Sequence, residues 1–363
     1  MENKMKASAF LLLLCVILGS FGICKAGGQI KEVVEKLCQN LGIVGKLGIG
    51  NEDHAKGLKM DYYEESCPQV EGIVRNITWS KVANNSTLAA KLLRIHYHDC
   101  FVRGCDASLL LDSTSNNTAE KEASPNRALT GYEVIDEIKS KLEKECPNTV
   151  SCADIVALVA RDAVSYQFQR PIWKVPTGRK DGRVSLASEV LPSLPSPFAD
   201  FPTLLQNFEN HSLGINDLVT LSGAHTLGRT HCTLIAKRLY NFTGKGDTDP
   251  SLDSDYAETL KTICPVPINP ATTLEMDPGS SLSFDSHYYM ALNQNKTLFL
   301  SDSALLTNPQ AAALAKDLQN FDDFLEHFKV SINKMGAIGV LTDGKGGEIR
   351  RTAELSILKS SWF

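Results

Sequence analysis

Ten cysteines in a chain of 363 residues constrain this fold most strongly, because their role depends on the compartment in which the chain matures. In a cytosolic enzyme they would indicate metal or redox chemistry, whereas in a secreted protein they indicate disulfides. The N-terminus favours secretion, because residues 9–18 (AFLLLLCVIL) form an apolar run after Lys4 and Lys6, and Ala26 suits a cleavage site. The run is too short to span a bilayer, which needs about 20 apolar residues. We therefore predict a signal peptide over 1–26.

Cleavage near Ala26 would leave eight cysteines, an even number that fits a disulfide framework without specifying its pairing. Several N-x-S/T sequons support the secretory interpretation; they begin at Asn76, Asn84, Asn85, Asn116, Asn210, Asn241 and Asn295. The 37 basic and 42 acidic residues give a net charge of −5, which argues against a nucleic-acid-binding protein. We expect a secreted, N-glycosylated, monomeric protein with no nucleic-acid partner and no membrane contact after signal removal.

The rest of the chain favours a mainly α fold. Residues 27–56 are predicted to be an N-terminal extension, with a short amphipathic helix and a glycine-rich tether. A single domain is predicted over 57–352, followed by a C-terminal tail over 353–363. Helical periodicity covers 70–82, 87–98, 131–144, 151–165, 201–211, 216–221, 231–241, 286–294, 309–317 and 322–335. The six prolines of 170–202 predict a long irregular connection, which would divide the domain into halves of about 57–195 and 196–352.

The densest group of reactive side chains lies at residues 93–108. If 87–98 is a helix, Arg94 and His98 are separated by four residues and share one face, with Tyr97 beside them. That face would present a permanent cation, a base that titrates near neutrality and an aromatic ring. His96 would point elsewhere. The arrangement predicts an acid–base surface.

Oxygen donors follow this helix directly. They are the side chains of Asp99, Asp106 and Ser108 and the backbone carbonyls of Val102 and Gly104. Carboxylates, a hydroxyl and carbonyls are the ligands that Ca²⁺ prefers, so the segment predicts a calcium loop.

A zinc site is the alternative interpretation of the same segment. Its ligands would be His96, His98, Cys100 and Cys105. We disfavour it because helical zinc pairs need a spacing of four residues, and because disulfide-forming conditions remove thiolate ligands.

A second group lies near His225, which ends an apolar helix after the small residues Gly223 and Ala224. Small residues there would let a flat group approach the backbone. Oxygen donors recur further along the chain, at Asp277, Ser280 and Asp285, and Thr226 would join them. Asp302 ends an apolar run, and its carboxylate would accept a ring N–H from a buried histidine.

Together these motifs resemble the secreted plant haem peroxidases, the class III family that includes the horseradish enzyme. RIHYHDCFVRGCDAS resembles the family's distal motif, and DLVTLSGAHTLG resembles its proximal haem motif. Six shorter motifs recur in family order: EKEASPN, SCADIVALVARDAV, WKVPTGRKD, LPSPF, FDSHYY and GEIR. The resemblance runs from about Leu58 to Arg351 and implies a haem peroxidase fold of about ten or more helices, with haem b held between a distal and a proximal half.

The resemblance assigns roles around the haem. His225 would be the axial iron ligand, and Asp302 would accept its other ring N–H. His98 would move a proton of H₂O₂ and Arg94 would stabilise the developing charge. Asn126 would orient His98.

The resemblance also implies roles for residues that lie further from the iron. Pro195 would place its carbonyl where phenolic donors dock. Two Ca²⁺ ions would bind, the distal one at Asp99, Val102, Gly104, Asp106 and Ser108 with Glu120 assisting through water. The proximal ion would bind Thr226, Asp277, Ser280, Ser283 and Asp285. The implied disulfides are Cys67–Cys146, Cys100–Cys105 and Cys232–Cys264.

The chain departs from the family pattern at three positions. Tyr97 stands where phenylalanine is usual, Leu227 stands where phenylalanine or isoleucine is common, and Ala353 replaces a cysteine that would pair with Cys152. Because Cys38 in the extension also lacks a partner, we predict a Cys38–Cys152 disulfide.

The leading functional hypothesis is therefore an extracellular peroxidase that uses H₂O₂ to oxidise phenolic donors by one-electron steps, with roles in cell-wall phenol chemistry, oxidative stress and H₂O₂ removal. The cell wall is the expected location and the vacuole an alternative. A non-catalytic calcium-binding cell-wall scaffold on the same fold is the competing hypothesis.

Overall fold

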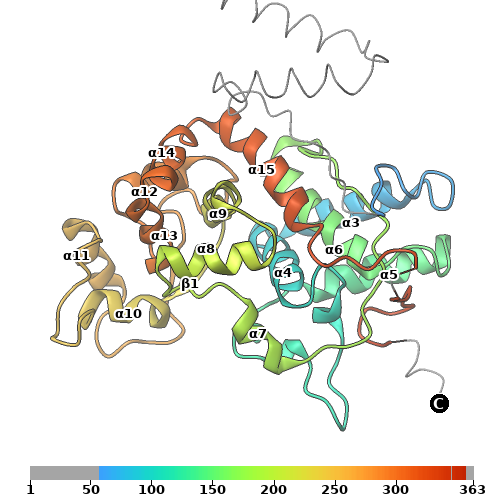
Figure 1. Cartoon of the computed structure of the whole chain (residues 1–363), viewed down its shortest axis with the longest axis horizontal. Helices are drawn as coiled ribbons and strands as arrows, with labels where there is room; N and C mark the ends of the chain where they lie inside the picture. The colour runs from blue at the N-terminus through green and yellow to red at the C-terminus, as the bar shows by residue number, and fades with distance from the viewer. Residues whose placement is uncertain (1–56, 345, 357–363) are drawn as a thin grey trace, which may run out of the picture. The chain divides into compact units, whose positions relative to one another are not determined.

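The computed structural model describes residues 57–344 and 346–356, and the predicted signal peptide and extension lie outside this range. Thirteen α-helices and two short strands are present in the described part of the chain (Figure 1). The helices of the first half are α3 (Val70–Asn84), α4 (Leu88–Val102), α5 (Tyr132–Glu145), α6 (Cys152–Ser165) and α7 (Ala187–Ser193). Those of the second half are α8 (Phe201–Asn210), α9 (Ile215–Ser222), α10 (Cys232–Tyr240), α11 (Ser254–Ile263), α12 (His287–Asn293), α13 (Leu300–Ala304), α14 (Pro309–Asp317) and α15 (Phe321–Met335). The mainly α prediction is confirmed.

Helix α6 forms the centre of the first half. All of its residues are buried, and α3, α4 and α5 pack around it. Its N-terminus is capped by Ser151, whose hydroxyl accepts the Asp154 N–H at 3.1 Å. Because α4 packs along this rigid, fully buried helix, the face that carries Arg94 and His98 is held in a fixed position.

The second half supplies the other candidate histidine. Helix α9 ends at Ser222 and continues as a 3₁₀ turn, Gly223–Thr226, which carries His225. Strands β1 (Arg229–His231) and β2 (Thr273–Glu275) pair antiparallel, with Thr230 opposite Leu274. This ribbon connects the turn to the segment that contains Asp277.

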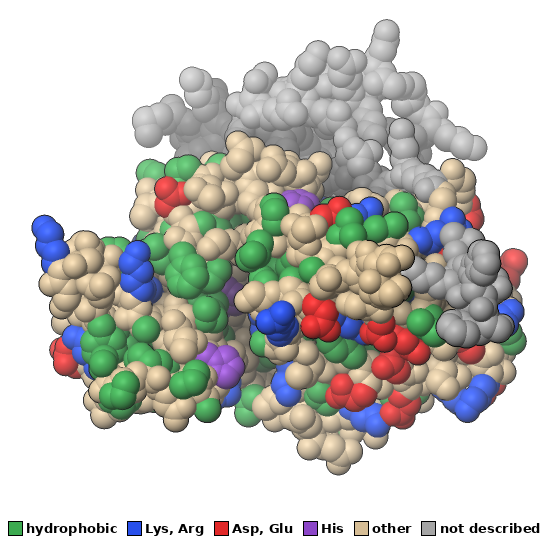
Figure 2. Space-filling view, turned by 90° about the horizontal axis from the view of Figure 1, so that it is seen from below, with side chains coloured by type: hydrophobic (Ala, Val, Ile, Leu, Met, Phe, Trp, Pro, Cys, Tyr) green, Lys and Arg blue, Asp and Glu red, His purple; other side chains and the backbone are tan. Residues whose placement is uncertain are grey.

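The main hydrophobic core crosses the predicted division near residue 195, because it includes side chains from α3–α6 and from α8, α9 and α12–α15. A separate, smaller core joins α10, α11 and the ribbon, and it contains the Cys232–Cys264 disulfide. Apolar side chains also remain exposed in this region, including Leu234, Ile263 and Val266. Figure 2 shows hydrophobic side chains gathered on this half of the face seen from below.

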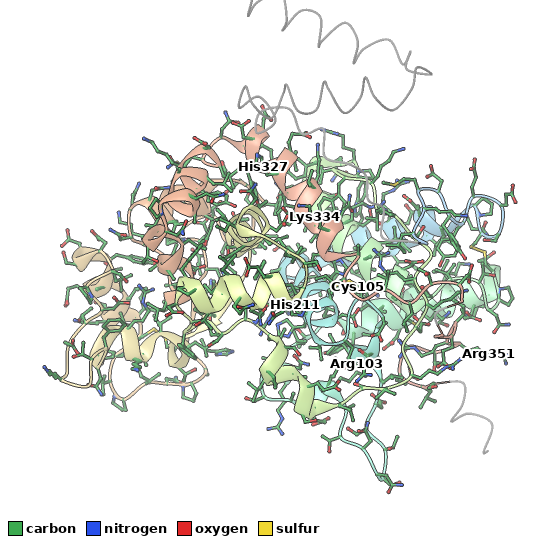
Figure 3. All side chains as sticks on the ribbon, viewed as in Figure 1. Arg103, Cys105, His211, His327, Lys334 and Arg351 are labelled. Atoms are coloured by element: carbon green, nitrogen blue, oxygen red, sulfur yellow. A yellow bond between two sulfur atoms is a disulfide. The ribbon has the colours of Figure 1, made fainter. Side chains whose placement is uncertain are left out.

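His211 joins the two halves directly. It follows α8, and its ring nitrogens lie 2.7 Å from the Asn207 carbonyl and 3.0 Å from the Phe101 carbonyl on α4 (Figure 3). The ring also packs on Phe101 with centroids 4.6 Å apart. The C-terminal turn of α4 is therefore fixed by a residue more than a hundred positions away.

Three helices were missed by the periodicity. Helix α7 lies within 170–202, so the prediction of an irregular connection throughout that segment is wrong. Its sequence ASEVLPS contains Pro192 and buries only Val190, which leaves almost no apolar period to detect. Helix α13 has only five residues, and α11 buries only Ala257 and Leu260, so neither shows a clear apolar period. No helix in the described ranges is long and apolar enough to cross a membrane.

Candidate active site

Arg94, Tyr97 and His98 lie on one face of α4, as their spacing predicts. The Arg94 Nε–H donates to His98 Nε2 at 3.1 Å. His98 is only 3% exposed, whereas Arg94 remains open to solvent. His96 lies on a different face and is buried, with Nδ1 3.5 Å from the Cys100 sulfur. The helix therefore separates a reactive histidine from a structural one.

The proton on His98 has a defined position. Because Nε2 accepts the hydrogen bond from Arg94, the ring proton belongs on Nδ1, which lies 2.7 Å from Asn126 Oδ1 and donates to it. The Asn126 amide in turn donates to the Glu120 carbonyl at 2.8 Å. This chain of bonds fixes the ring and leaves the Nε2 lone pair directed toward Arg94.

The charge state of His98 follows from its surroundings. Burial and the positive charge of Arg94 lower the pKa of His98 to about 3, although the hydrogen bond to Asn126 raises it. The imidazole is therefore neutral at physiological pH. A neutral, oriented imidazole beside a permanent cation can accept a proton from a bound acid while the cation stabilises the anion that forms.

The second histidine has an acidic partner. His225 Nδ1 lies 2.7 Å from Asp302 Oδ1, and Asp302 is 2% exposed. The Asp302 carboxylate also accepts from the Tyr288 hydroxyl at 3.0 Å and from the Phe299 N–H at 3.2 Å. Three donors converge on one buried carboxylate, so its position is fixed.

These bonds leave His225 Nε2 without a hydrogen-bond partner among the described residues. The His225 side chain keeps 36% of its surface exposed, although Tyr288 and Phe299 pack edge-on against its ring. An imidazole with a carboxylate on Nδ1 and no partner on Nε2 is the donor arrangement that a haem iron requires. Figure 2 shows histidine side chains along the crevice between the two halves of the molecule. The residues present therefore fit haem.

The expected role of Gly223 is wrong. A Cβ on Gly223 would lie 2.5 Å from the Tyr289 hydroxyl and 2.6 Å from the Phe324 ring. Gly223 therefore allows α9 to pack against α12 and α15 in the core, rather than admitting a flat group to the backbone.

The predicted distal calcium residues surround the end of α4. The Ala107 N–H donates to Asp99 Oδ2 at 3.0 Å, the Ser108 N–H donates to Asp106 Oδ1 at 2.9 Å, and the Gly104 carbonyl accepts from Asp106. The Val102 carbonyl belongs to the last turn of α4. Four buried oxygens have no hydrogen-bond partner among the described residues: Asp99 Oδ1, Ser108 Oγ, and both Glu120 carboxylate oxygens.

The electrostatics of this cluster favour a nearby positive charge. Burial and the neighbouring carboxylates of Asp106 and Glu120 hold the pKa of Asp99 well above its usual range. Burial raises the pKa of Glu120 to about 8. Arg350 is the nearest compensating charge, and its guanidinium already donates to the Ala107 and Ala353 carbonyls. Partnerless carboxylate oxygens in a buried loop are the donor set that Ca²⁺ fits.

The predicted proximal residues also come together. The Thr226 hydroxyl lies 3.2 Å from Asp277 Oδ2, 3.1 Å from Asp285 Oδ1 and 3.2 Å from the Ser283 carbonyl. The Ser280 hydroxyl donates to Asp285 Oδ2 at 2.6 Å. Burial raises the pKa of Asp277.

Two residues of the site were missed by the sequence analysis. Tyr288 donates to Asp302, and His287 Nδ1 lies 2.6 Å from Asp277 Oδ1. Both belong to the FDSHYY motif, which carried the family resemblance but no assigned role. The sequence around both residues has the periodicity of an ordinary helix, so only their contacts with residues distant in sequence identify them as part of the site.

The structure contains the disulfides Cys67–Cys146, Cys100–Cys105 and Cys232–Cys264, the pairs that the resemblance implies. The Cys100–Cys105 bond removes both thiolates of the alternative zinc site. No group of three or more His, Cys, Asp or Glu side chains in the described ranges is placed to hold a metal ion. Cys152 is buried and has no disulfide partner among the described residues. Cys38 lies outside those residues, so the Cys38–Cys152 pair stays a prediction.

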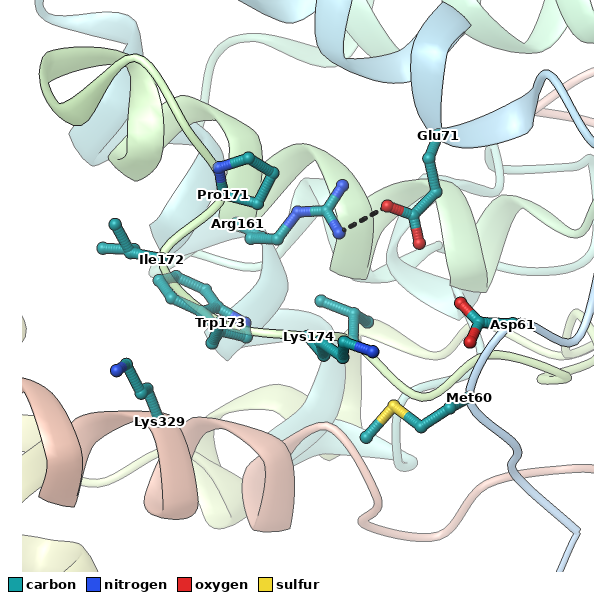
Figure 4. A pocket seen from close by; sticks show the side chains of 10 residues that line it. Met60, Asp61, Glu71, Arg161, Pro171, Ile172, Trp173, Lys174 and Lys329 are labelled. Atoms are coloured by element: carbon teal, nitrogen blue, oxygen red, sulfur yellow. Dashed lines mark hydrogen bonds and ion pairs between the residues drawn. The ribbon is translucent and has the colours of Figure 1, made fainter.

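Other predicted or prominent features lie apart from the histidines. Pro195 is half-buried in the loop between α7 and α8. A cavity of about 500 Å³ lies between α3, α6 and α15 (Figure 4). The ion pair between Arg161 and Glu71 forms part of its lining. None of its lining residues belongs to the predicted site, so this cavity is not the predicted reactive centre.

Comparison with known proteins identifies the family. The family model described as peroxidase matches residues 74–320, more than half of the chain. Peroxidase 24 of Arabidopsis thaliana is 56% identical over 335 residues, covering 89% of this chain and 94% of the relative. Peroxidase 1 of Arabidopsis thaliana is 52% identical over 300 residues, covering 81% and 90% respectively. Peroxidase 27 of the same plant is 50% identical over 301 residues, covering 82% and 92%. The chain therefore belongs to the peroxidase family, as a plant-type haem peroxidase.

Proposed function

We propose that this peroxidase is a secreted, extracellular enzyme that uses H₂O₂ to oxidise phenolic donors in one-electron steps. The observation that carries the proposal is that two histidines have different hydrogen-bond partners, which suit one of them to be a base and the other to be an iron ligand. His98 is a neutral base held by Asn126 beside Arg94, and His225 is a candidate ligand held by Asp302. In each histidine, Nδ1 has a side-chain hydrogen-bond partner, and Nε2 lies on the other side of the ring.

Bound haem would supply an iron centre that reduces peroxide and then oxidises two donor molecules, one after the other. Within the protein, His98 Nε2 accepts a proton from one oxygen of H₂O₂ and returns it to the other oxygen, which leaves as water. Arg94 donates hydrogen bonds to the oxygen that acquires negative charge. Asn126 keeps the second proton of His98 on Nδ1, so Nε2 stays available throughout.

The proximal residues act on the ligand rather than on the substrate. Asp302 accepts a hydrogen bond from the Nδ1–H of His225 and makes the imidazole a stronger electron donor through Nε2. Tyr288 and the Phe299 N–H hold Asp302 in place by donating to both of its oxygens. Pro195 would present its carbonyl to the hydroxyl of a docked phenol.

One absorbance experiment tests the proposal. The purified protein is expected to show a Soret band that shifts on addition of H₂O₂ and returns when a phenol such as guaiacol is added. A protein without a Soret band, or with a band that does not respond to H₂O₂, would contradict the proposal and favour the non-catalytic scaffold. Detection of the native protein in cell-wall extract, rather than in vacuoles, tests the proposed location, and its mobility before and after glycosidase treatment tests glycosylation.

We further propose that two Ca²⁺ ions hold the backbone beside the two catalytic histidines. Asp99 directly follows His98, and Thr226 directly follows His225. The distal loop is also linked to His98 through Asn126 and the Glu120 backbone. Removing calcium would leave buried carboxylates in contact and disturb both histidines.

Asp106→Asn is expected to reduce the calcium content from two ions to one ion per chain, as measured by elemental analysis. Loss of an ion held at 100 times its Kd would lower the free energy of unfolding by about 2.7 kcal/mol. The matched control is Asp112→Asn, because Asp112 is an exposed acid that pairs with Lys121. An Asp106→Asn protein that retains two ions would contradict the distal site.

The calcium-free protein should also show a characteristic pH dependence. Burial raises the pKa of Glu120 from 4.5 to about 8, so the fold favours the protonated acid. This contribution to stability is complete below about pH 4.5 and is lost as the pH rises to about 8. Thermal unfolding with a chelator present should therefore show a falling Tm over this interval, which calcium abolishes.

A further inference from the structure

Tyr97 lies on the reactive face of α4, but the chemistry proposed above gives it no role. It follows Arg94 by three residues and directly precedes His98. Its ring packs edge-on against His98, with centroids 5.1 Å apart and planes at 85°. It also packs against Phe101, with centroids 4.9 Å apart. Contacts on two sides fix the ring, so its hydroxyl has a defined position.

The Tyr97 hydroxyl has no hydrogen-bond partner among the described residues, although burial raises its pKa. It is not one of the enclosed polar atoms that lack a partner. Other tyrosines near charged residues differ: Tyr288 donates to Asp302, and the Tyr132 hydroxyl is closed off from solvent. Tyr97 therefore combines a fixed ring with an accessible, uncommitted hydroxyl.

The neighbouring charge gives the hydroxyl a direction. Arg94 lies close enough to act electrostatically on the Tyr97 phenol. A cation attracts the phenolic oxygen and repels its proton, so the O–H bond points away from the guanidinium. Tyr97 then acts as a donor to a third group rather than as an acceptor from Arg94.

We propose that Tyr97 is a specificity-determining hydrogen-bond donor of the peroxide site, and that it favours small ligands that accept a hydrogen bond, such as peroxide oxygens and small anions. This inference rests on the proposed haem peroxidase function. Arg94, Tyr97 and His98 then form three polar groups on one helix face. Tyr97 strengthens binding of an accepting ligand without taking part in the proton transfer between Nε2 and peroxide.

The test uses the haem-loaded enzyme and two probes that bind haem iron. Fluoride accepts hydrogen bonds strongly, whereas carbon monoxide, bound to the reduced enzyme, accepts them weakly. Tyr97→Phe removes the hydroxyl and keeps the ring that packs on His98. One lost hydrogen bond should weaken fluoride binding by roughly five- to ten-fold in an absorbance titration. Carbon monoxide affinity should stay within about two-fold, because the variant loses no packing.

Tyr166→Phe is the matched control. Tyr166 is also half-buried, and its ring packs edge-on against an aromatic residue, Trp79, rather than against a catalytic histidine. Its fluoride affinity should equal that of the unaltered enzyme.

The outcomes separate the two proposals. Equal fluoride affinities of Tyr97→Phe and the unaltered enzyme would overturn the role of Tyr97 and leave the peroxidase function intact. Equal weakening of fluoride and carbon monoxide would also overturn it, because that pattern indicates a general change of packing. An unaltered enzyme without a Soret band would overturn the proposed function, and the role of Tyr97 with it.

Discussion

Replacing His98 by leucine is expected to lower the second-order rate constant for reaction with H₂O₂ by roughly 10²- to 10⁴-fold. The substitution removes the base that accepts the peroxide proton, and Arg94 has no proton-accepting atom that would replace it. The proposed haem ligand, His225, lies on a different element, so the Soret band should remain. Stopped-flow absorbance after mixing with H₂O₂ measures the rate constant directly.

His96→Gln is the matched control, because His96 lies on the same helix and is buried to the same extent, but on another face. We expect a loss of thermal stability and an unchanged peroxide reaction. The unaltered enzyme should also react at a constant rate between about pH 4 and pH 8, since burial and Arg94 lower the pKa of His98 to about 3. A His98→Leu enzyme that reacts as fast as His96→Gln would contradict the proposed base.

Replacing His225 by alanine is expected to have the second large effect, a loss of bound haem. Removal of an outer partner of a metal ligand typically costs 10- to 100-fold in affinity or activity, and removal of the ligand itself should cost more. The ratio of Soret absorbance to protein concentration after purification measures this loss. Asp302→Asn should retain more haem than His225→Ala, because it removes the partner and keeps the ligand.

A suitable control is His231→Ala, six residues further along the chain. His231 is exposed on β1, and its Nδ1 lies 2.8 Å from the Pro270 carbonyl. It should retain the full haem content. If His225→Ala purified with the same Soret band as this control, His225 would not be the axial ligand.

The sequence predicted most of the helices, because their apolar residues recur with the helical period. Helix α14 has the predicted bounds 309–317, and α6 begins one residue after its predicted start at 151. Helices α7 and α13 were missed because seven or five residues contain too few turns to show a period. Their boundaries depend on caps and on neighbouring helices, which are contacts between distant segments.

The site was predictable where its residues are close in sequence or carry a family motif. Arg94 and His98 follow from helical spacing alone, whereas Asn126 follows only from the resemblance. The partners Tyr288 and His287 were missed, because hydrogen bonds across 14 and 10 residues leave no period in the chain. The expectation for Gly223 was wrong for a related reason. The sequence shows that the residue is small, but it does not show that Tyr289 and Phe324 leave no room for a side chain there.

Arg350 has a consequence for the order in which the molecule can be completed. Its guanidinium donates to the Ala107 carbonyl at 2.7 Å, across 243 residues of sequence. Its backbone N–H donates to Asp181 at 2.9 Å. Ala107 belongs to the loop beside His98, so one side of that loop is supplied by a residue translated 243 positions later. Until Arg350 has been translated, the loop lacks this buried guanidinium. The loop after α4, in the first half of the described domain, is therefore completed only after most of the second half has been synthesised.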